Sequence, residues 1–238
     1  MTEALQKTPL VLIPGLLLTG DMWAHQTRHL GDLADITIAD TLRDQSIEAM
    51  ADRLLVAAPA RFALAGLSMG GYVALSVMRK APERVTKLAL MDTQARPDSE
   101  ESKRKRRGLL SLSKRGEFKG VTPRLLPMLV HEDRLGDQSL IDAIMAMAAA
   151  VGQEGFARQQ QAIMDRVDSR DILGGIEVPT LVLCGRQDAL TPLPLHEEMA
   201  AIIPTARLAI IEDCGHLPAM ERPQAVTALM RDCLVYDR

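Results

Sequence analysis

One stretch decides the fold of this chain: Phe62-Ala63-Leu64-Ala65-Gly66-Leu67-Ser68-Met69-Gly70-Gly71. An apolar run leads into a serine that has a glycine two positions before it and another two positions after it, the pattern G-x-S-x-G. A serine at a sharp turn from strand to helix is held in a strained backbone conformation that exposes its hydroxyl at the end of a sheet. The two glycines let the backbones of strand and helix pass without a Cβ clash. Ser68 is therefore a candidate nucleophile.

Short apolar runs recur before and after this stretch, and helical patterns separate most of them. The expected strands lie at residues 10–13, 36–39, 62–65, 85–91, 180–184 and 207–211. Strands that alternate with helices predict parallel βαβ units, and therefore an α/β fold with a doubly wound, mostly parallel sheet. Ligands of such sheets bind at the carboxyl ends of the strands, where Ser68 would lie.

Strand patterns are missing from the middle of the chain. Four helical stretches are expected there, one that starts near Pro97 and three at residues 122–130, 139–151 and 154–167. An all-helical segment inserted between strands is most simply a cap over the carboxyl edge of the sheet. The sequence thus predicts an α/β core formed by residues 1–93 and 172–238, and an inserted helical cap, or lid, formed by residues 94–171.

The composition is that of an ordinary globular protein, with 238 residues, 47% hydrophobic residues, 25% charged residues and a net charge of −3. This balance favours neither a nucleic acid nor a membrane as partner, and no apolar stretch approaches the roughly 20 residues of a membrane-spanning helix. The basic run at residues 103–107 has no interleaved aromatic residues and predicts a solvated helix face. Three cysteines without a C-x-x-C pattern, and an N-terminus that lacks the form of a signal peptide, favour a cytoplasmic protein.

A serine hydroxyl needs an adjacent base, most often an imidazole that a carboxylate orients. The chain has five histidines, and His216 stands out among them. Its loop, Asp213-Cys214-Gly215-His216-Leu217-Pro218, directly follows the last expected strand, and its glycine and proline fix a turn at the carboxyl end of the sheet. His216 is therefore the candidate base.

The other four histidines have less specific surroundings. His25 and His29 share one face of the first helix, where a surface or packing role is expected. His196 stands next to two glutamates on a helix, and we expect it on a solvated face. His131 ends a cap helix and could touch the substrate.

The acid that orients the histidine should also leave the end of a strand. Asp188, in Gly185-Arg186-Gln187-Asp188, follows the strand at residues 180–184 in this way. Asp92 closes the strand at residues 85–91, and a carboxylate there could also reach the histidine. Asp188 is the preferred acid, and Asp92 stays open as a residue that assists or replaces it.

The chain order Ser68, Asp188, His216 is the order of one class of serine hydrolases. With Pro14-Gly15 after the first strand, and Glu221-Arg222-Pro223 after the histidine loop, the sequence resembles the α/β-hydrolase fold superfamily over nearly its whole length. The resemblance implies a catalytic triad of these three residues and no metal or organic cofactor.

The resemblance also implies an oxyanion hole formed by the backbone N–H groups of Leu16 and Met69. The N–H of Met69 would lie at the N-terminus of a helix, whose dipole favours developing negative charge. Many members of the superfamily carry His-Gly where this chain has Pro14-Gly15. The N–H of Leu16 can still serve, because a backbone donor needs no particular side chain.

These features predict a serine hydrolase that cleaves a carboxylic ester of small to medium size through an acyl-enzyme, that is, a carboxylesterase. The side chains expected to bind the substrate are apolar and rich in methionine, which suits adaptable contact with acyl or alkyl groups. They are Leu17, Trp23, Met128, Met145, Leu190 and Leu217. Two alternatives are open: a lactonase similar to 3-oxoadipate enol-lactonases, and a ligand-binding receptor with little turnover. The expected partner is a small-molecule ester or lactone, and the sequence leaves the oligomeric state open.

Overall fold

A computed structural model describes residues 7–117 and 120–236 of the chain. In this part of the chain six strands form one sheet in the order β2-β1-β3-β4-β5-β6, and every neighbouring pair is parallel. The strands are β1 (Thr8–Ile13), β2 (Ala34–Ile38), β3 (Phe62–Leu67), β4 (Val85–Met91), β5 (Thr180–Gly185) and β6 (Ala206–Ile211). The α/β fold and the parallel sheet predicted from the sequence are therefore confirmed.

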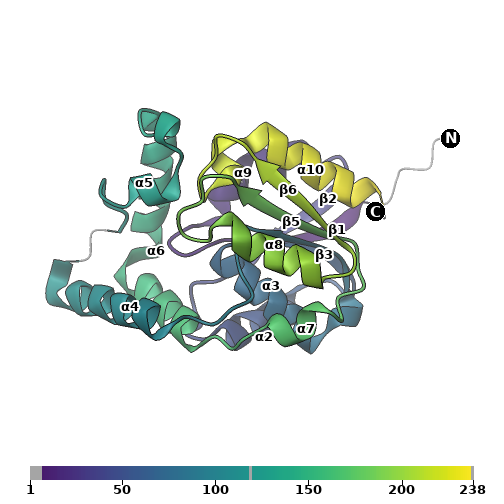
Figure 1. Ribbon diagram of the computed structural model, residues 1–238, viewed down its shortest axis with the longest axis horizontal. Coiled ribbons are helices and arrows are strands. Elements are labelled where there is room, and N and C mark those ends of the chain that lie inside the picture. The colour runs from purple at the N-terminus through teal and green to yellow at the C-terminus, as the bar shows by residue number, and fades with distance from the viewer. Residues whose placement is uncertain (1–6, 118–119, 237–238) are drawn as a thin grey trace.

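Helices cover both faces of the sheet (Figure 1). One face carries α1 (Ala24–Leu30), which follows the short helix η1 (Gly20–Trp23), together with α9 (Pro218–Glu221) and α10 (Pro223–Val235). The other face carries α2 (Ile47–Ala57), α3 (Met69–Lys80) and α8 (Leu193–Ile202). The short helix η2 (Pro82–Arg84) leads from α3 into β4.

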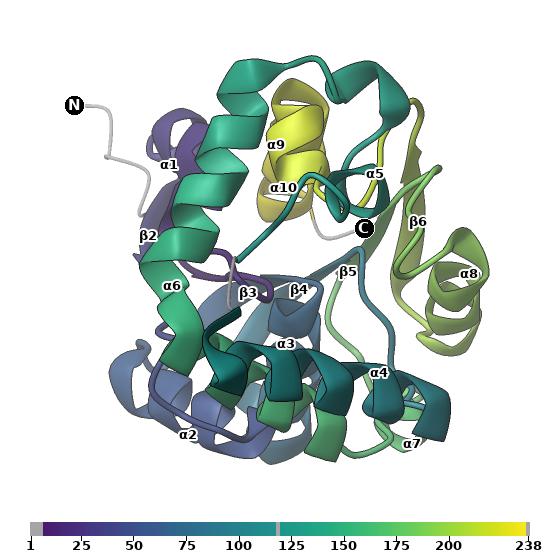
Figure 2. The same ribbon diagram turned by 90° about the vertical axis from the view of Figure 1, so that its left-hand side faces the viewer.

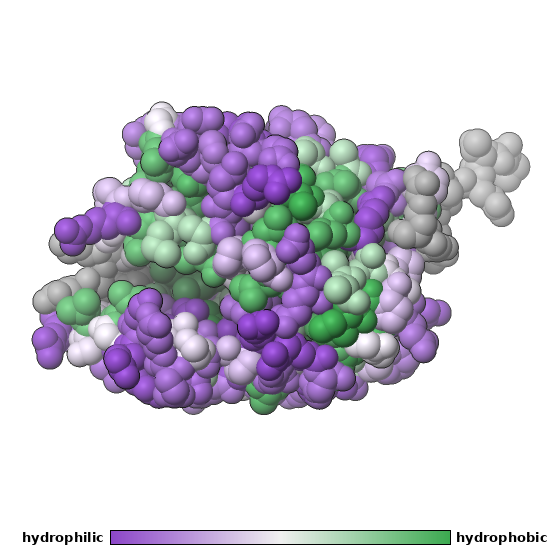
Figure 3. All heavy atoms as spheres, viewed as in Figure 1, coloured by the Kyte–Doolittle hydropathy of each residue, from purple (hydrophilic) through white to green (hydrophobic). Residues whose placement is uncertain are grey.

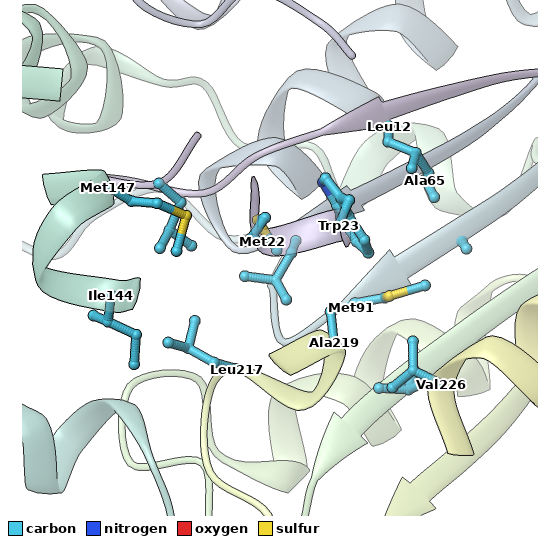
Figure 4. Packing of buried hydrophobic residues seen from close by; sticks show 14 of the residues in the cluster. Leu12, Met22, Trp23, Ala65, Met91, Ile144, Met147, Leu217, Ala219 and Val226 are labelled. Carbon is cyan, nitrogen blue, oxygen red and sulfur yellow. The ribbon is translucent and has the colours of Figure 1, made fainter. Parts of the chain in front are cut away.

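The strands divide their side chains between these two helical layers. In β1, Leu10 and Leu12 join the hydrophobic cluster under α1 and α10, whereas Val11 and Ile13 join the cluster under α2 and α3. Figure 4 shows part of the first cluster, in which Leu12 lies near Trp23. A strand buried on both faces must be apolar at nearly every position, and this is why β3 and β5, which are buried along their whole length, could be recognised as continuous apolar runs.

Between β4 and β5 the described residues form helices and the loops that connect them, and no strand. It contains α4 (Glu100–Leu112), η3 (Ser113–Glu117), α5 (Leu126–Leu129), η4 (Glu132–Arg134), α6 (Gln138–Asp165) and α7 (Arg170–Leu173). Figure 2 shows α4, α5 and α6 facing the viewer, across one end of the sheet. The helices expected in this region are present, and the division into a core and a cap at residues 94 and 171 stays a prediction.

Two of these helices differ from the prediction. The stretch at residues 122–130 forms only the four-residue helix α5. The stretches at 139–151 and 154–167 are joined in α6, which is kinked at Gly152, where φ is 68° and ψ is 179°. Glycine adopts this conformation at little steric cost, so the kink replaces the expected break.

Helix α6 is also long and apolar enough to cross a membrane, which the sequence analysis did not expect. Length and composition are weak evidence on their own, because a core helix of a soluble protein meets the same criteria. Here the helix is interrupted at Gly152, and Ile144, Met147 and Ile163 are buried in the hydrophobic clusters of the protein. Packing within the fold accounts for the apolar character of α6.

Candidate active site

Ser68 lies between β3 and α3 with φ at 55° and ψ at −115°. Its N–H donates to the carbonyl oxygen of Met91 at 2.9 Å, and its carbonyl oxygen accepts from Thr93 Oγ1 at 2.8 Å. Both partners belong to β4 and the residues that follow it, so the neighbouring strand holds the turn. Such a conformation costs of order 1–3 kcal/mol and persists only where the surroundings impose it. The strained turn predicted from the G-x-S-x-G pattern is present.

The two glycines of the pattern allow very close backbone contacts. A Cβ on Gly66 would lie 2.2 Å from the carbonyl oxygen of Gly70, and a Cβ on Gly70 would lie 2.2 Å from the carbonyl oxygen of Ile13. No side chain fits at such distances. The start of α3 is therefore pressed against the end of β1, and the loop that follows β1 lies beside Ser68.

His216 forms a hydrogen bond of 2.8 Å between its Nδ1 and Oδ2 of Asp188, and both side chains are buried. The loops after β5 and β6 supply the two residues, as expected. Oδ1 of Asp188 accepts from the N–H groups of Leu190 at 2.8 Å and Thr191 at 3.0 Å, so the carboxylate is fixed in position. Burial by itself would raise the pKa of Asp188, but the charge and hydrogen bond of His216, with hydrogen bonds from Thr191, hold it well below its usual range.

The other nitrogen of the imidazole has no hydrogen-bond partner in the part of the chain that the structure describes. In particular, no hydrogen bond within these residues joins His216 to the hydroxyl of Ser68. Hydrogen bonds between a nucleophile and its base are often long in the absence of substrate. The pair of His216 and Asp188 is thus formed, and Ser68 lies at the same edge of the sheet, after β3.

Asp92 is the second carboxyl group at this edge, and it is fully buried at the end of β4. Its Oδ1 accepts from the N–H of Gly185 at 2.9 Å, and its Oδ2 has no partner among the described residues. The polar atoms of Asp92, Asp188 and His216 lie within 4.8 Å of one another. Burial, and then the charge of Asp188, raise the pKa of Asp92 well above its usual range, which favours the neutral form. Of the two candidate acids, the structure pairs Asp188 with the imidazole.

Glu221 is a buried carboxylate that the sequence analysis quoted only as part of a motif. Its oxygens accept from the N–H groups of Gly215 at 3.0 Å and Leu217 at 3.1 Å, on either side of His216. It also accepts from the N–H of His131 at 2.7 Å. One side chain therefore fixes the histidine loop and ties it to the chain between α5 and α6. Nothing in the local sequence distinguishes this glutamate from a solvated one.

The amides expected to form the oxyanion hole are free. Neither the N–H of Leu16 nor the N–H of Met69 donates to an acceptor within the described residues. Leu16 is followed by Leu17 in a left-handed conformation with φ at 60°, and the N–H of Leu18 bonds to the carbonyl oxygen of Gly15 at 3.2 Å. Two unpaired donors, one on each side of the close contact between α3 and β1, are available to an incoming oxyanion.

The prediction for His196 is wrong. Its side chain is completely buried, and its Nε2 accepts from the N–H of Thr93 at 2.9 Å. Burial lowers the pKa of His196 to about 4, so this imidazole is neutral.

His25, for which a surface or packing role was expected, forms a hydrogen bond of 2.8 Å between its Nδ1 and Oγ1 of Thr227. His131 is buried, and its Nδ1 accepts from the N–H of Asp133 at 3.2 Å.

The six side chains predicted to bind the substrate fall into two groups. Leu17, Trp23 and Leu217 are buried in the same hydrophobic cluster, and Figure 4 shows Leu217 pointing toward Ile144 and Met147 of α6. The other three are 39% to 43% exposed: Met128, Met145 and Leu190. Figure 3 shows apolar residues in a hollow between the surface over α4 and the surface over α5. Whether these six residues bind a substrate stays a prediction.

The basic run at residues 103–107 borders a cavity of about 520 Å³ between α4 and the second half of α6. Lys103 and Arg107 line it together with Lys114, Arg115 and Asp165. Arg107 is exposed, as predicted, whereas Lys103 is only half exposed. None of the predicted catalytic residues lines this cavity, so it is separate from the site around Ser68.

Comparisons with known proteins agree with this geometry. A family model described as "Alpha/beta hydrolase family" matches residues 10–229. A pimeloyl-[acyl-carrier protein] methyl ester esterase from Aromatoleum aromaticum is 30% identical over 202 residues, which cover 80% of each chain. A thermophilic esterase from Thermogutta terrifontis is 34% identical, with a TM-score of 0.86 over 94% of this chain and 88% of that one. The enol-lactonase from Burkholderia xenovorans has a TM-score of 0.85 at 24% identity, covers 97% and 92% of the two chains, and shows the fold alone.

Proposed function

The chain belongs to the alpha/beta hydrolase family, and on that premise we propose that it is a carboxylesterase that cleaves esters of small to medium size through an acyl-enzyme. The observation that carries the proposal is the 2.8 Å hydrogen bond between His216 and the buried Asp188, at the sheet edge where the strained Ser68 lies. The names of the relatives support ester hydrolysis in general. The identity of the ester is part of the proposal.

In the proposed mechanism Nε2 of His216 removes the proton of Ser68 as its oxygen attacks the acyl carbon. The N–H groups of Leu16 and Met69 hold the oxyanion of the tetrahedral intermediate. The imidazolium returns its proton to the leaving alcohol, and an acyl-enzyme remains. A water molecule then gives a proton to His216 as it attacks the acyl carbon. The imidazolium returns this proton to the oxygen of Ser68 as the acyl–oxygen bond breaks, which releases the acid and restores the serine. Asp188 orients the imidazole through Nδ1 and stabilises its cation.

The proposed cap, residues 94–171, supplies the walls of the substrate site. Leu17 and Leu217 belong to one cluster with Ile144 and Met147 of α6, which gives the site an apolar floor. Met128, Met145 and Leu190 are exposed enough to contact an acyl or alkyl group, and Trp23 backs the floor from the core. An apolar lining with flexible methionine side chains suits a small or medium hydrocarbon group.

We also keep a cytoplasmic location as part of this proposal.

The test compares the wild type with Ser68→Ala on a panel of short-chain aryl esters, methyl esters and enol-lactones. We expect steady turnover of the esters by the wild type, and a fall in kcat on the order of 10⁶ for the variant. Equal rates for the two proteins would contradict the proposal. Preferred turnover of the lactones would replace the esterase by a lactonase, and single-turnover hydrolysis with tight ligand binding would replace it by a receptor.

A second candidate substrate is a methyl ester carried on an acyl carrier protein, which is named for the relative from Aromatoleum aromaticum. The specific observation that favours it here is the cation-rich surface of α4 and η3, with Arg107, Lys114 and Arg115 exposed. The same panel decides between the two when it includes one methyl ester both free and attached to a carrier protein. A preference for the attached form that is lost in Arg107→Glu supports the carrier. Equal rates for both forms support the free ester.

A further inference from the structure

The loop after β1 contains a strained residue directly beside the amide that the proposed mechanism uses. The N–H of Leu18 bonds to the carbonyl oxygen of Gly15, which closes a four-residue turn with Leu16 and Leu17 at its centre. Leu17 has φ at 60°. A positive φ at the third position is what a type II turn requires, and glycine normally fills it. A leucine there needs an external contact to hold it.

Gln159 of α6 makes that contact. Its Oε1 accepts from the N–H of Leu17 at 3.0 Å, and its Nε2 donates to the carbonyl oxygen of Thr41 at 3.3 Å. Gln159 is completely buried, and Leu17 and Thr41 are almost so. Water does not reach these buried groups, so removal of the Gln159 amide would leave the N–H of Leu17 without a hydrogen-bond partner. The side chain therefore links the loops that follow β1 and β2.

The N–H of Leu17 belongs to the central peptide of the turn. In a type I turn this peptide is rotated by about half a turn, and the third residue has φ near −90°. An ordinary leucine prefers that form, since a left-handed conformation costs it roughly 1–2 kcal/mol. An acceptor placed on the N–H of Leu17 opposes the rotation. Such a rotation changes ψ of Leu16 and φ of Leu17 together, so the backbone of the turn would have to readjust around Leu16, whose own N–H, in the preceding peptide, is the unpaired donor.

We propose that Gln159 is a positioning residue for the oxyanion hole: by accepting the N–H of Leu17, it keeps the turn in the form that presents the N–H of Leu16 to the oxyanion. Gln159 itself does not contact the reacting atoms. The inference rests on the proposed function, since it assigns a role in that reaction. Helix α6 would then do more than cover the site, because it would also position a backbone N–H donor of the core.

The chain offers a matched control in the next residue. Gln160 is equally buried on the same helix, but its Oε1 accepts from Nη1 of Arg106 at 2.8 Å, away from the turn. Gln159→Met and Gln160→Met therefore remove the same side-chain amide from neighbouring buried positions. Gln159→Met loses the hydrogen bonds to Leu17 and Thr41, and Gln160→Met loses the one from Arg106, so we expect the melting temperature to fall in both variants and to fall further in Gln159→Met.

Steady-state kinetics on a short aryl ester test the inference. We expect kcat of Gln159→Met to fall at least tenfold, toward the roughly 10²- to 10³-fold loss seen when one oxyanion donor is removed. The KM should change little, and the affinity for a trifluoromethyl ketone, which forms an oxyanion on the serine, should fall in parallel with kcat. Gln160→Met should keep the kcat of the wild type. Equal kcat values for the two variants would overturn the inference.

A double-mutant cycle separates a positioning role from a general loss of packing. Glycine adopts a positive φ without steric cost, so Leu17→Gly should let the turn keep its form without Gln159. We expect Gln159→Met to reduce kcat much less in the Leu17→Gly background than in the wild type. An undiminished effect in that background would also overturn the inference. Failure of the proposed function is seen separately, because Ser68→Ala would then retain the wild-type rate.

Discussion

Replacement of the two buried acids by asparagine tests the acid assignment most directly. In Asp188→Asn the side-chain oxygen can still accept from the N–H groups of Leu190 and Thr191. The amide nitrogen then faces Nδ1 of His216, where Asp188 Oδ2 now lies at 2.8 Å. An amide donor forces Nδ1 to act as the acceptor, so the proton moves to Nε2. The nitrogen that should remove the proton of Ser68 is then blocked.

The size of this effect follows from the tautomer. A wrong tautomer with intact geometry lowers kcat by about 10⁴ in the Ser-His-Asp template, which corresponds to about 5.4 kcal/mol at 1.36 kcal/mol for each factor of ten. Asp92→Asn should behave differently, because burial already favours the neutral form of this carboxyl. Asparagine is neutral and has the same shape, and its oxygen can accept from the N–H of Gly185 as Oδ1 does. We expect a change in kcat of less than about tenfold, or 1.4 kcal/mol.

The assay is the hydrolysis of a short aryl ester between pH 5 and pH 9, with active sites titrated by an organophosphate. Circular dichroism spectra of both variants check that the fold is retained. If Asp92→Asn abolishes turnover while Asp188→Asn spares it, the acid assignment is wrong. If both variants lose about 10⁴ in kcat, Asp92 is an essential partner of the pair, and the reasoning from its neutral form fails.

Two further predictions concern stability. Burial lowers the pKa of His196 from 6.5 to about 4, and 2.5 units at 1.36 kcal/mol each give about 3 kcal/mol. This stability is present above pH 6.5 and is lost as the pH falls toward 4, because the unfolded chain binds the proton first. His196→Gln keeps an acceptor for the N–H of Thr93 but cannot titrate, so its free energy of unfolding should lack this decrease between pH 6.5 and pH 4. Urea unfolding measures that free energy, and an equal decrease over this range in variant and wild type would contradict the prediction. In Gly70→Ala the added Cβ would lie 2.2 Å from the carbonyl oxygen of Ile13, so we expect a loss of at least about 1–3 kcal/mol. Gly108→Ala is the control, since nothing lies within 4 Å of its added Cβ, and an equal loss in both variants would refute the steric argument.

The sheet and the strained serine could be predicted because short-range rules determine them. A parallel strand under two helical layers has no polar face, so β3 and β5 appear in the sequence as unbroken apolar runs. The turn at Ser68 needs glycines at fixed offsets, because Gly66 and Gly70 each meet a backbone oxygen. These requirements lie within a few residues of one another, where a single sequence can show them.

His196 was misjudged because its sequence neighbours do not share its environment. Glu198, two positions after His196, is paired with Arg96 in an exposed ion pair, with Nη2 and Oε1 at 2.8 Å. Each residue position on a helix turns a side chain by about 100°, so two positions place His196 on nearly the opposite side from Glu198, and there it accepts from the N–H of Thr93, after β4. Charged neighbours indicate the exposed side of a helix, and they say little about the residue beside them.

The contacts that complete the site join residues that are far apart in the chain. Gln159 and Leu17 are 142 positions apart, and Glu221 accepts from His131 across 90 positions. A buried glutamine or glutamate carries no local pattern that distinguishes it from an exposed one, so only the folded arrangement identifies it. The same reasoning applies to the substrate. The proposed role of Ser68 as nucleophile follows from its own turn, whereas the proposed choice of ester depends on the proposed cap. Gln159 and the chain at His131 connect that region to the loops after β1 and β6. Substitutions in α6 should therefore change the rate of the reaction as well as the range of esters that bind.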